Sequence, residues 1–342
     1  MRRRSSPSVA LAALAIAAAL TAGCAGGLRE RSARRAATGG VGESATSTVV
    51  SPTSSPAGGP ASTAPATTAP VCAPPSSPLT SGTRTVTVKG VEREYMVAVP
   101  TTATGAAAPV ILNFHGSSSN MVEQAAYSQL AQQGTPRGYV VVTPQGSGTP
   151  RGWSLRGPGD DDAFVDAILA DLATGACIDT HRVYAVGISN GSAYAALLAC
   201  RAPYRIAAVG MVAATLPSLC PVDHPVPALA FHGTADPVVP YGGGMVNGER
   251  LGVQAPGAEG AIAQWAQRNG CGAEAREVSY AADVVWRSWT GCRDDASVEF
   301  YSVVGGGHTW PGGIPIPRLG ATTASISATA TFLDFFDHLP RR

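Results

Sequence analysis

The segment at residues 187–191, which reads Gly-Ile-Ser-Asn-Gly, constrains the fold of this chain more than any other. It follows an apolar run at 182–186 that is typical of a strand, and it precedes an Ala/Leu-rich run at 192–199 that is typical of a helix. We therefore predict a strand, a tight turn and a helix, with Ser189 at the apex of the turn. The small residues on either side of the serine would let the strand and the helix pack closely and leave the hydroxyl group pointing outward.

Strand-like and helix-like runs alternate along the chain from about residue 81 onward. Strands are expected at 109–114, 138–143, 182–187, 206–212, 227–231 and 297–303, and helices at 121–133, 160–174, 190–201, 258–269 and 323–337. Two further runs, 84–88 and 93–99, surround Gly90 and predict an antiparallel hairpin. This alternation predicts the α/β class, with a mostly parallel sheet covered by helices on both faces and the hairpin at its edge. One folded domain, residues 81–342, accounts for it.

A serine hydroxyl becomes a nucleophile only when a base accepts its proton, and the base needs an acid to orient it. Asp236 lies just beyond the predicted strand at 227–231, which is where open α/β sheets place their active sites. We therefore predict that Asp236 is the acid. The alternative is that Asp236 and Pro237 form an ordinary turn.

His308 is the expected base. It follows a predicted strand and three glycines at 305–307, and such a loop can bring an imidazole over the serine. The other histidines downstream of Ser189 fit other places, namely a proline-rich loop, the turn that carries the acid, and the end of the last helix (His224, His232 and His338).

Acyl transfer also needs two backbone N–H groups that stabilise the developing oxyanion. One is expected from Asn190, the residue after the serine. The second is expected from the loop after the strand at 109–114, and we predict the N–H of Ser117. The neighbouring amides of Gly116 and Ser118 remain alternatives, and His115 in the same loop is interpreted as structural.

Four separated segments agree in order and spacing: 114–116 (Phe-His-Gly), 187–191, 232–240 and 306–313. Together they resemble the polyhydroxybutyrate depolymerase/feruloyl esterase family of secreted α/β-hydrolases, which includes mycobacterial-type esterase lipoproteins. The resemblance covers about residues 83 to 338. It implies an α/β-hydrolase fold and a catalytic triad of Ser189, Asp236 and His308.

The same resemblance implies a serine carboxylic-ester hydrolase that works through an acyl-enzyme. Its substrates would be hydroxyalkanoate polyesters, feruloyl esters or acetyl esters of plant polysaccharide. A serine peptidase on the same fold and a non-catalytic surface protein remain the alternatives. An intact triad argues against the second.

An acidic run, Asp160 to Asp162, resembles the family's Asp-Asp motif at a helix start, although Asp162 replaces an apolar residue there. Acidic residues are favoured at a helix N-terminus, and this is the plain interpretation; calcium binding is a minor alternative. Trp153 and Trp310 are candidates for lining the substrate pocket, with ordinary packing as the alternative.

Charge and motifs exclude several function classes. The formal net charge is +1 and only 14% of the residues are charged, so nucleic acid is not an expected partner. The sequence contains no P-loop, HExxH, GxGxxG or C-x-x-C spacing. We therefore predict no metal and no nucleotide cofactor.

The N-terminus predicts export. A basic start at 1–4 precedes an apolar stretch at 9–20 that is too short to span a bilayer comfortably. Residues 20–24 resemble a bacterial lipobox, with Thr21 where leucine is commonest, so residues 1–23 are a predicted signal peptide and Cys24 a predicted lipidation site. Cleavage nearby without lipidation is the alternative. We expect an extracellular protein, either secreted or held at the cell surface through this anchor alone.

Residues 24–80 are rich in Ser, Thr, Ala, Pro and Gly. This composition buries too little apolar area to offset the entropy of ordering, which predicts a disordered linker between Cys24 and the catalytic domain.

Cysteine usage points to disulfides. The chain has 7 Cys, and setting Cys24 aside leaves an even number. We predict that Cys271 pairs with Cys292. The other four allow three pairings, which the sequence leaves open (Cys72, Cys177, Cys200 and Cys220). Free buried thiols are the alternative.

Overall fold

The computed structural model of this protein describes residues 78–101, 106–201, 206–221, 223–247 and 254–341. The predicted signal peptide, Cys24, Cys72 and most of the predicted linker lie outside the described residues. The chain divides into one unit up to Ala61 and a second from Ser62 to Arg342, and every described residue belongs to the second unit.

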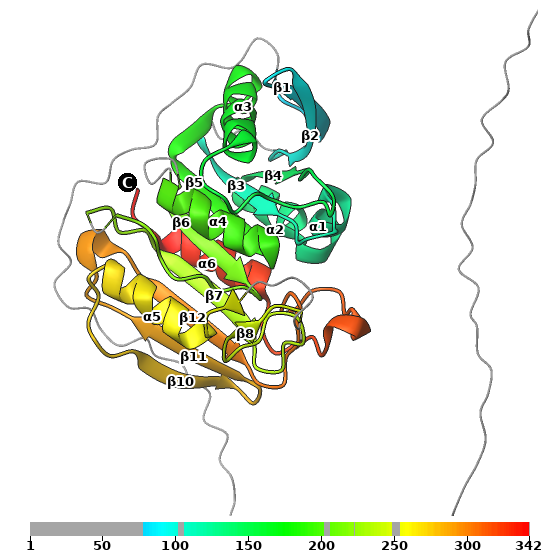
Figure 1. The fold of residues 1–342 in the computed structure, drawn as a ribbon. Coiled ribbons are helices and arrows are strands. Elements are labelled where there is room, and N and C mark those ends of the chain that lie inside the picture. Colours follow the sequence, from blue (N-terminus) through cyan, green and yellow to red (C-terminus); the bar gives the residue numbers. More distant parts are fainter. Residues whose placement is uncertain (1–77, 102–105, 202–205, 222, 248–253, 342) are drawn as a thin grey trace, which may run out of the picture. The chain divides into compact units, whose positions relative to one another are not determined.

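A ten-stranded sheet forms the centre of this unit, with the strand order β1-β2-β4-β3-β5-β6-β7-β12-β11-β10 (Figure 1). Its strands are β1 (Gly82–Val88), β2 (Val91–Ala98), β3 (Ala108–Phe114), β4 (Val140–Pro144), β5 (Ile178–Ile188), β6 (Ala208–Val212), β7 (Ala228–Gly233), β10 (Arg276–Ala281), β11 (Val284–Trp289) and β12 (Val298–Val303). The six central strands pair in parallel, and the two outer strands at each edge pair antiparallel. A parallel centre is covered on both faces, and β3, β4, β6 and β7 are accordingly buried along almost their whole length.

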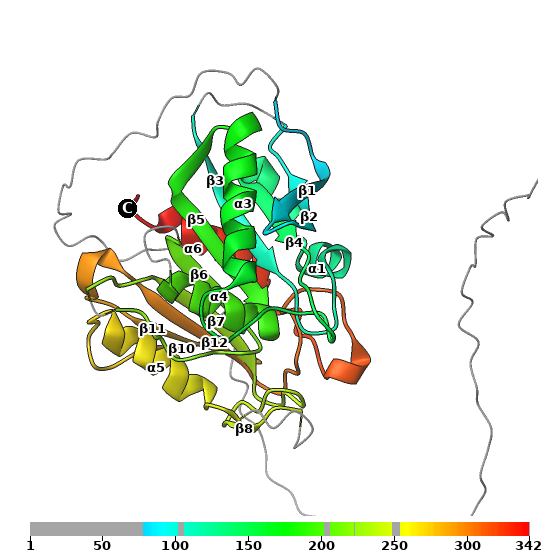
Figure 2. The ribbon, with the colours of Figure 1, turned by 45° about the horizontal axis from the view of Figure 1, so that its top comes forward.

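Helices cover both faces of the sheet (Figure 2). They are α1 (Met121–Ser128), α2 (Leu130–Gly134), α3 (Asp160–Gly175), α4 (Asn190–Arg201), α5 (Ala258–Arg268) and α6 (Ala328–His338). One apolar core contains buried side chains of α3, α4 and α5, and a second contains those of α1, α2 and α6. Successive residues of β3 divide between the two cores, since Leu112 belongs to the first and Ile111 to the second.

The predicted α/β class, the alternation and the N-terminal hairpin are confirmed. Two predicted helices have different bounds. The helix expected at 121–133 is divided by Gln129, whose φ of 53° is left-handed and ends α1. The helix expected from 323 begins at Ala328, because the side chain of Ser327 caps it by accepting a hydrogen bond from the N–H of Ala330.

The sequence analysis did not predict β10 and β11, which form an antiparallel extension beyond β12. In β10 no residue is fully buried, so its apolar pattern is too weak to distinguish an edge strand from a loop. A short two-stranded sheet, β8 (Gly244–Met245) and β9 (Gln254–Ala255), lies in the chain between β7 and α5 and was also not predicted.

Two disulfides join described cysteines to each other. Cys271 pairs with Cys292, as predicted, and Cys200 at the end of α4 pairs with Cys220. Cys177 is also disulfide-bonded. None of the helices in the described part of the chain is long and apolar enough to cross a membrane.

Candidate active site

Ser189 lies in the tight turn between β5 and α4, as predicted. Its φ is 57°, in the left-handed region that residues other than glycine rarely adopt. Its N–H donates to the carbonyl of Val212, at the end of the neighbouring strand, at 2.9 Å. A Cβ on Gly187 would lie 2.3 Å from the carbonyl carbon of Gly191, and a Cβ on Gly191 would lie 2.3 Å from the carbonyl oxygen of Phe114. Both glycines are therefore required by close approach, which holds the serine in its strained conformation.

Asp236 follows β7, and its side chain is 0% exposed. Its Oδ1 accepts the N–H groups of Val238 and Val239, both at 2.8 Å. Its Oδ2 lies 2.8 Å from Nδ1 of His308. Burial disfavours the ionised carboxylate, but the hydrogen bonds from His232, His308 and the Val239 N–H outweigh it and lower the pKa of Asp236 to about 2. The acid is therefore ionised at neutral pH.

His232 lies in the turn that carries the acid, as expected, and it orders that turn. Its Nε2 lies 2.9 Å from the carbonyl oxygen of Val239 and 3.5 Å from Oδ2 of Asp236. A carbonyl only accepts, so Nε2 carries the hydrogen, and Nδ1 is left to accept from the hydroxyl of Thr215 at 3.5 Å. Neither nitrogen of His232 remains available as a base.

His308 follows β12, and its loop packs tightly against its neighbours. The N–H of His308 donates to the carbonyl of Leu319 at 2.7 Å. A Cβ on Gly307 would lie 2.2 Å from that same carbonyl oxygen, and a Cβ on Gly233 would lie 2.2 Å from the carbonyl oxygen of Gly306. The glycines before the histidine thus allow the loops after β7 and β12 to touch, and this contact brings Asp236 within reach of His308.

The three candidate residues lie at one edge of the sheet. Strands β5, β6, β7 and β12 are consecutive and parallel, so their carboxyl ends meet at the same edge (Figure 1). Ser189 follows β5, Asp236 follows β7 and His308 follows β12. This edge is where open α/β sheets bind their ligands.

The loop after β3 lies against the serine. A Cβ on Gly116 would lie 3.3 Å from Cβ of Ser189. The N–H of Ser118 donates to the carbonyl of Arg151 at 2.7 Å, so this amide is already engaged. Of the three amides considered for the second oxyanion donor, those of Gly116 and Ser117 remain.

The side chain of Asn190 has a role that the sequence analysis missed. Its Oδ1 accepts the N–H of Trp153 at 2.7 Å, and its Nδ2 donates to the carbonyl of Trp153 at 3.1 Å. The residue after the serine is thereby fastened to a loop 37 positions earlier in the chain. The only signal in the sequence is the asparagine itself, whose amide group can both donate and accept hydrogen bonds. No neighbouring residue in the sequence indicates that Trp153 is its partner.

His115 is structural, as interpreted from the sequence. Its Nδ1 lies 2.8 Å from the carbonyl of Gly116, its Nε2 accepts the N–H of Gly146 at 2.9 Å, and its own carbonyl accepts from Nε1 of Trp153 at 2.9 Å. Burial lowers the pKa of His115, so the ring is neutral and holds the loop after β3 in place.

Both candidate pocket tryptophans are buried. Trp153 is 4% exposed and stacks on Tyr194 of α4, with ring centroids 5.3 Å apart. Trp310 is 1% exposed, donates from Nε1 to the hydroxyl of Thr329 at 2.9 Å and packs on Phe332 of α6. Ordinary packing, the alternative given above, accounts for these contacts. A pocket-lining role for either residue stays a prediction.

Each aspartate at the start of α3 has a structural partner. Asp160 pairs with exposed Lys89 at 2.7 Å, and Asp161 pairs with buried Arg93 at 3.0 Å. Asp162 accepts the N–H of Gly159 at 2.7 Å, which caps the helix. These contacts agree with the helix-start interpretation. Among the described residues, no group of three or more His, Cys, Asp or Glu side chains is arranged to hold a metal ion.

Comparison with known proteins places this chain in a family. The family model Esterase PHB depolymerase matches residues 93–218. The putative esterase NocK of Nocardia uniformis subsp. tsuyamanensis is 30% identical over 286 residues, which cover 75% of this chain and 82% of that protein. This chain belongs to the polyhydroxybutyrate depolymerase/feruloyl esterase family. The predicted family, one of carboxylic ester hydrolases, is thus confirmed.

A feruloyl esterase and a solved acetyl xylan esterase structure also match this chain. Feruloyl esterase B of Piromyces equi is 29% identical over 232 residues, which cover 63% of this chain and 42% of that protein. This chain therefore spans less than half of that relative. Among solved structures, the acetyl xylan esterase from Aspergillus awamori covers 75% of this chain and 99% of its own, at 12% identity and a TM-score of 0.51. That likeness shows the α/β-hydrolase fold, as predicted.

Proposed function

We propose that this chain is a serine carboxylic-ester hydrolase in which Ser189 is the nucleophile, His308 the general base and Asp236 the acid that orients it. The observation that carries the proposal is the 2.8 Å hydrogen bond between Nδ1 of His308 and Oδ2 of Asp236, at the sheet edge where Ser189 lies. Because Nδ1–H is donated to an ionised carboxylate, Nε2 is the nitrogen that is free to accept a proton.

The proposed reaction has two half-reactions. Nε2 of His308 takes the hydroxyl proton of Ser189 as Oγ attacks the ester carbonyl, and the N–H groups of Asn190 and Ser117 stabilise the oxyanion. His308 then gives the proton to the leaving alcohol, and an acyl-serine remains. Water repeats the cycle, which releases the carboxylic acid and restores the serine.

The substrate proposal follows from the relatives. Their names include feruloyl esterase and acetyl xylan esterase, and the matching family model is that of PHB depolymerase esterases. We therefore infer an ester substrate drawn from hydroxyalkanoate polyesters or plant cell-wall esters. No cofactor takes part in the proposed steps, because the serine, the imidazole and the backbone amides supply the nucleophile, the base and the oxyanion donors.

The proposed setting is outside the cytoplasm. The disulfides Cys200–Cys220 and Cys271–Cys292 support it, since such bonds persist in oxidising compartments. We further infer that residues 1–23 are an export signal, that Cys24 carries a lipid anchor and that residues 24–80 link it to the catalytic domain at 81–342. Metabolic labelling with an alkyne fatty acid tests the anchor: label is expected on the wild type and not on Cys24→Ala.

Two assays test the catalytic proposal: labelling with a fluorophosphonate probe, and hydrolysis of p-nitrophenyl butyrate. The wild type should label at Ser189 and hydrolyse the ester, and Ser189→Ala should do neither while keeping its thermal unfolding midpoint. Retained turnover in Ser189→Ala would remove Ser189 from the role. Labelling combined with cleavage of a peptide amide, but of no ester, would indicate a peptidase instead. A protein that binds without catalysis would not label.

A further inference from the structure

The ring of His232 contacts the proposed acid but takes no part in the proposed proton transfers. It lies near the end of β7, four positions before Asp236, and is 2% exposed. Its Nε2–H faces two acceptors, the carbonyl oxygen of Val239 at 2.9 Å and Oδ2 of Asp236 at 3.5 Å. A hydrogen shared in this way makes a three-centre bond. In a buried site, such an N–H dipole acts strongly on the charge of the acid.

The contact with His232 completes the set of donors around Asp236. Oδ1 accepts the backbone N–H groups of Val238 and Val239, and Oδ2 faces the ring nitrogens of His308 and His232. A carboxylate has about four acceptor positions, so all of them are used. His308 alone among these donors gains a positive charge in the proposed reaction. The other three are neutral, so they stabilise the carboxylate without cancelling its charge.

Val239 links the ring to the acid a second time. Its N–H donates to Oδ1 of Asp236 at 2.8 Å, and its carbonyl accepts from Nε2 of His232 at 2.9 Å. The three residues therefore form a closed circuit that reaches both carboxylate oxygens. Rotation of the carboxylate would break this circuit, so His232 restrains the orientation of the acid as well as its charge.

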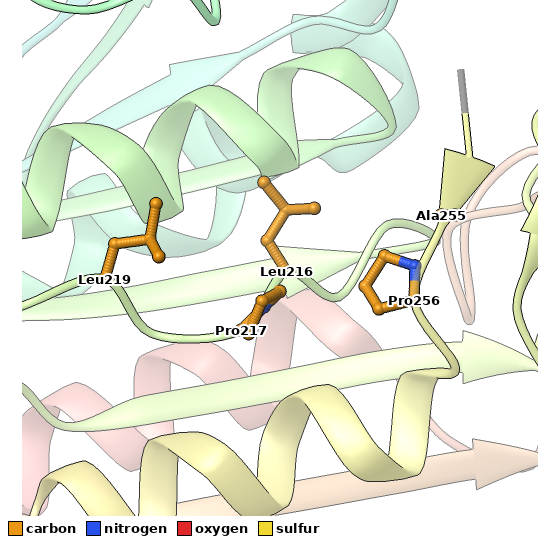
Figure 3. A pocket seen from close by; sticks show the side chains of 5 residues that line it. All are labelled: Leu216, Pro217, Leu219, Ala255 and Pro256. Atoms are coloured by element: carbon orange, nitrogen blue, oxygen red, sulfur yellow. The ribbon is translucent and has the colours of Figure 1, made fainter. Parts of the chain in front are cut away.

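The opposite nitrogen of His232 is held from the loop after β6. Nδ1 lies 3.5 Å from Oγ1 of Thr215. The carbonyls of its two neighbours, Ala214 and Leu216, accept hydrogen bonds from side chains of α4 and α5, both at 2.7 Å. Leu216 lines a surface pocket between these two helices (Figure 3). Because both neighbours are fastened, Thr215 is fixed against the ring and favours the tautomer in which Nε2 carries the hydrogen.

We propose that His232 is a positioning residue for the proposed reaction, because its neutral N–H holds the Asp236 carboxylate in place and moderates the pull of that carboxylate on the proton of His308. The inference rests on the proposed function, in which His308 is the base. Although burial raises the pKa of Asp236, the hydrogen bonds from His232 and His308 lower it to about 2. Without His232 the charge of the acid is less stabilised, so the His308 imidazolium forms more readily and gives up its proton less readily.

The titratable and charged groups around His232 come from the loops after β7 and β12, from α5 and from β11. They are Asp236, His308, Tyr241, Glu259 and Arg287. The ring of Tyr241 packs edge-on against the imidazole, with centroids 5.7 Å apart, and burial raises its pKa to about 12. Glu259 accepts from the Tyr241 hydroxyl and pairs with Arg287 at 3.0 Å. A change in acid pH dependence when His232 is replaced therefore reports on Asp236 and His308.

The pH profile of kcat/KM for p-nitrophenyl butyrate tests the proposal with two variants. The side chain of His232→Asn is too short to reach Asp236, whereas the longer amide of His232→Gln brings a donor to the position of Nε2. The Asn variant should lower kcat about tenfold with little change in KM, and it should move the acid limb of the profile up by about 0.5 pH unit. The Gln variant should restore both values. Tyr241→Phe is the matched control, since it loses hydrogen bonds to Glu259 and Ser302 in the same region but keeps its ring, and it should leave the acid limb in place.

A titration without turnover separates this proposal from the proposed function. In Ser189→Ala, NMR follows the ring of His308 as the pH changes. Adding His232→Asn should shift the midpoint upward by about 0.5 pH unit, and adding His232→Gln should not. If the wild type hydrolyses no ester but this shift appears, the role of His232 stands and the catalytic proposal fails.

Two results overturn the role of His232. One is a folded His232→Asn variant in which neither the acid limb nor the His308 titration moves. The other is a His232→Gln variant that behaves like His232→Asn, because a retained donor would then have no effect. If His232→Asn does not fold, His232→Leu takes its place, since leucine removes every hydrogen bond of the ring and leaves no new polar group buried.

Discussion

The side chain of Asn190 exchanges two hydrogen bonds with the backbone of Trp153, accepting its N–H at 2.7 Å and donating to its carbonyl at 3.1 Å. This pairing fixes the residue that directly follows the proposed nucleophile. The N–H of Asn190 is a proposed oxyanion donor, so the pairing holds a backbone donor in position through a side chain. Preorganised donors of this kind supply much of the stabilisation of a transition state.

We therefore expect Asn190→Ala to lower kcat by about 10- to 100-fold, because small displacements of a catalytic group have effects of this size. Asn269 offers a matched control, since its side chain makes the same pair of hydrogen bonds to the backbone of Val226. Asn269→Ala should destabilise the fold to a similar extent and leave kcat unchanged. Equal kcat losses in the two variants would show that the effect of Asn190 is only on stability.

Asp236→Asn should reduce kcat by about 10⁴-fold, because an asparagine would favour the wrong tautomer of His308. Asp179→Asn is the control, since Asp179 is equally buried, pairs with Arg182 at 2.7 Å and lies at the start of β5, opposite the active edge. That variant should lose stability but not activity. Steady-state hydrolysis of p-nitrophenyl butyrate, together with thermal unfolding, separates the two effects.

Stability should also depend on acid pH through Asp236. Its pKa falls from an ordinary 3.8 to about 2 in the folded protein, so the folded state binds this proton less readily than the unfolded state. The resulting contribution is fully present above pH 3.8 and is lost as the pH falls towards about 2. It corresponds to about 2 kcal/mol of unfolding free energy. Urea unfolding from pH 5 to 2 should show a shallower decline in Asp236→Asn than in the wild type.

The turn around Ser189 should not tolerate any side chain at Gly191. A Cβ there would meet the carbonyl oxygens of Phe114 and His115 at 2.3 and 2.5 Å, so Gly191→Ala should abolish or severely impair folding. Gly260→Ala in α5 is the matched control, because a Cβ at Gly260 meets nothing within 4 Å. That change should stabilise the protein by up to about 1 kcal/mol, since alanine favours the helix. The soluble yield and unfolding midpoint of the two variants provide the comparison.

The ion pair between Arg93 and Asp161 should be essential to the start of α3. The side chains are only 9% and 6% exposed, and Asp161 also accepts the N–H of Ser154. Removing one partner leaves a buried charge, so Asp161→Ala should cost about 3–5 kcal/mol of unfolding free energy. Asp160→Ala removes the exposed partner of Lys89 next to it and should have no measurable effect. Equal losses in both variants would contradict this assignment.

Local features of the fold were predictable from the sequence. The strand, turn and helix around Ser189, the parallel alternation and the hairpin around Gly90 each depend on residues that are neighbours in the chain. The candidate acid and base were also accessible, because Asp236 and His308 each follow a strong apolar run. Carboxyl ends of parallel strands share an edge, so topology alone places these two loops and the Ser189 turn together.

Only the tertiary structure decided the features that join distant segments. The pairing of Asn190 with Trp153, the buried contact of Asp161 with Arg93 and the disulfide between Cys200 and Cys220 have no local signal. Edge strand β10 was missed because it buries no residue fully. Local propensity acts between chain neighbours, whereas these contacts depend on how the sheet orders its strands.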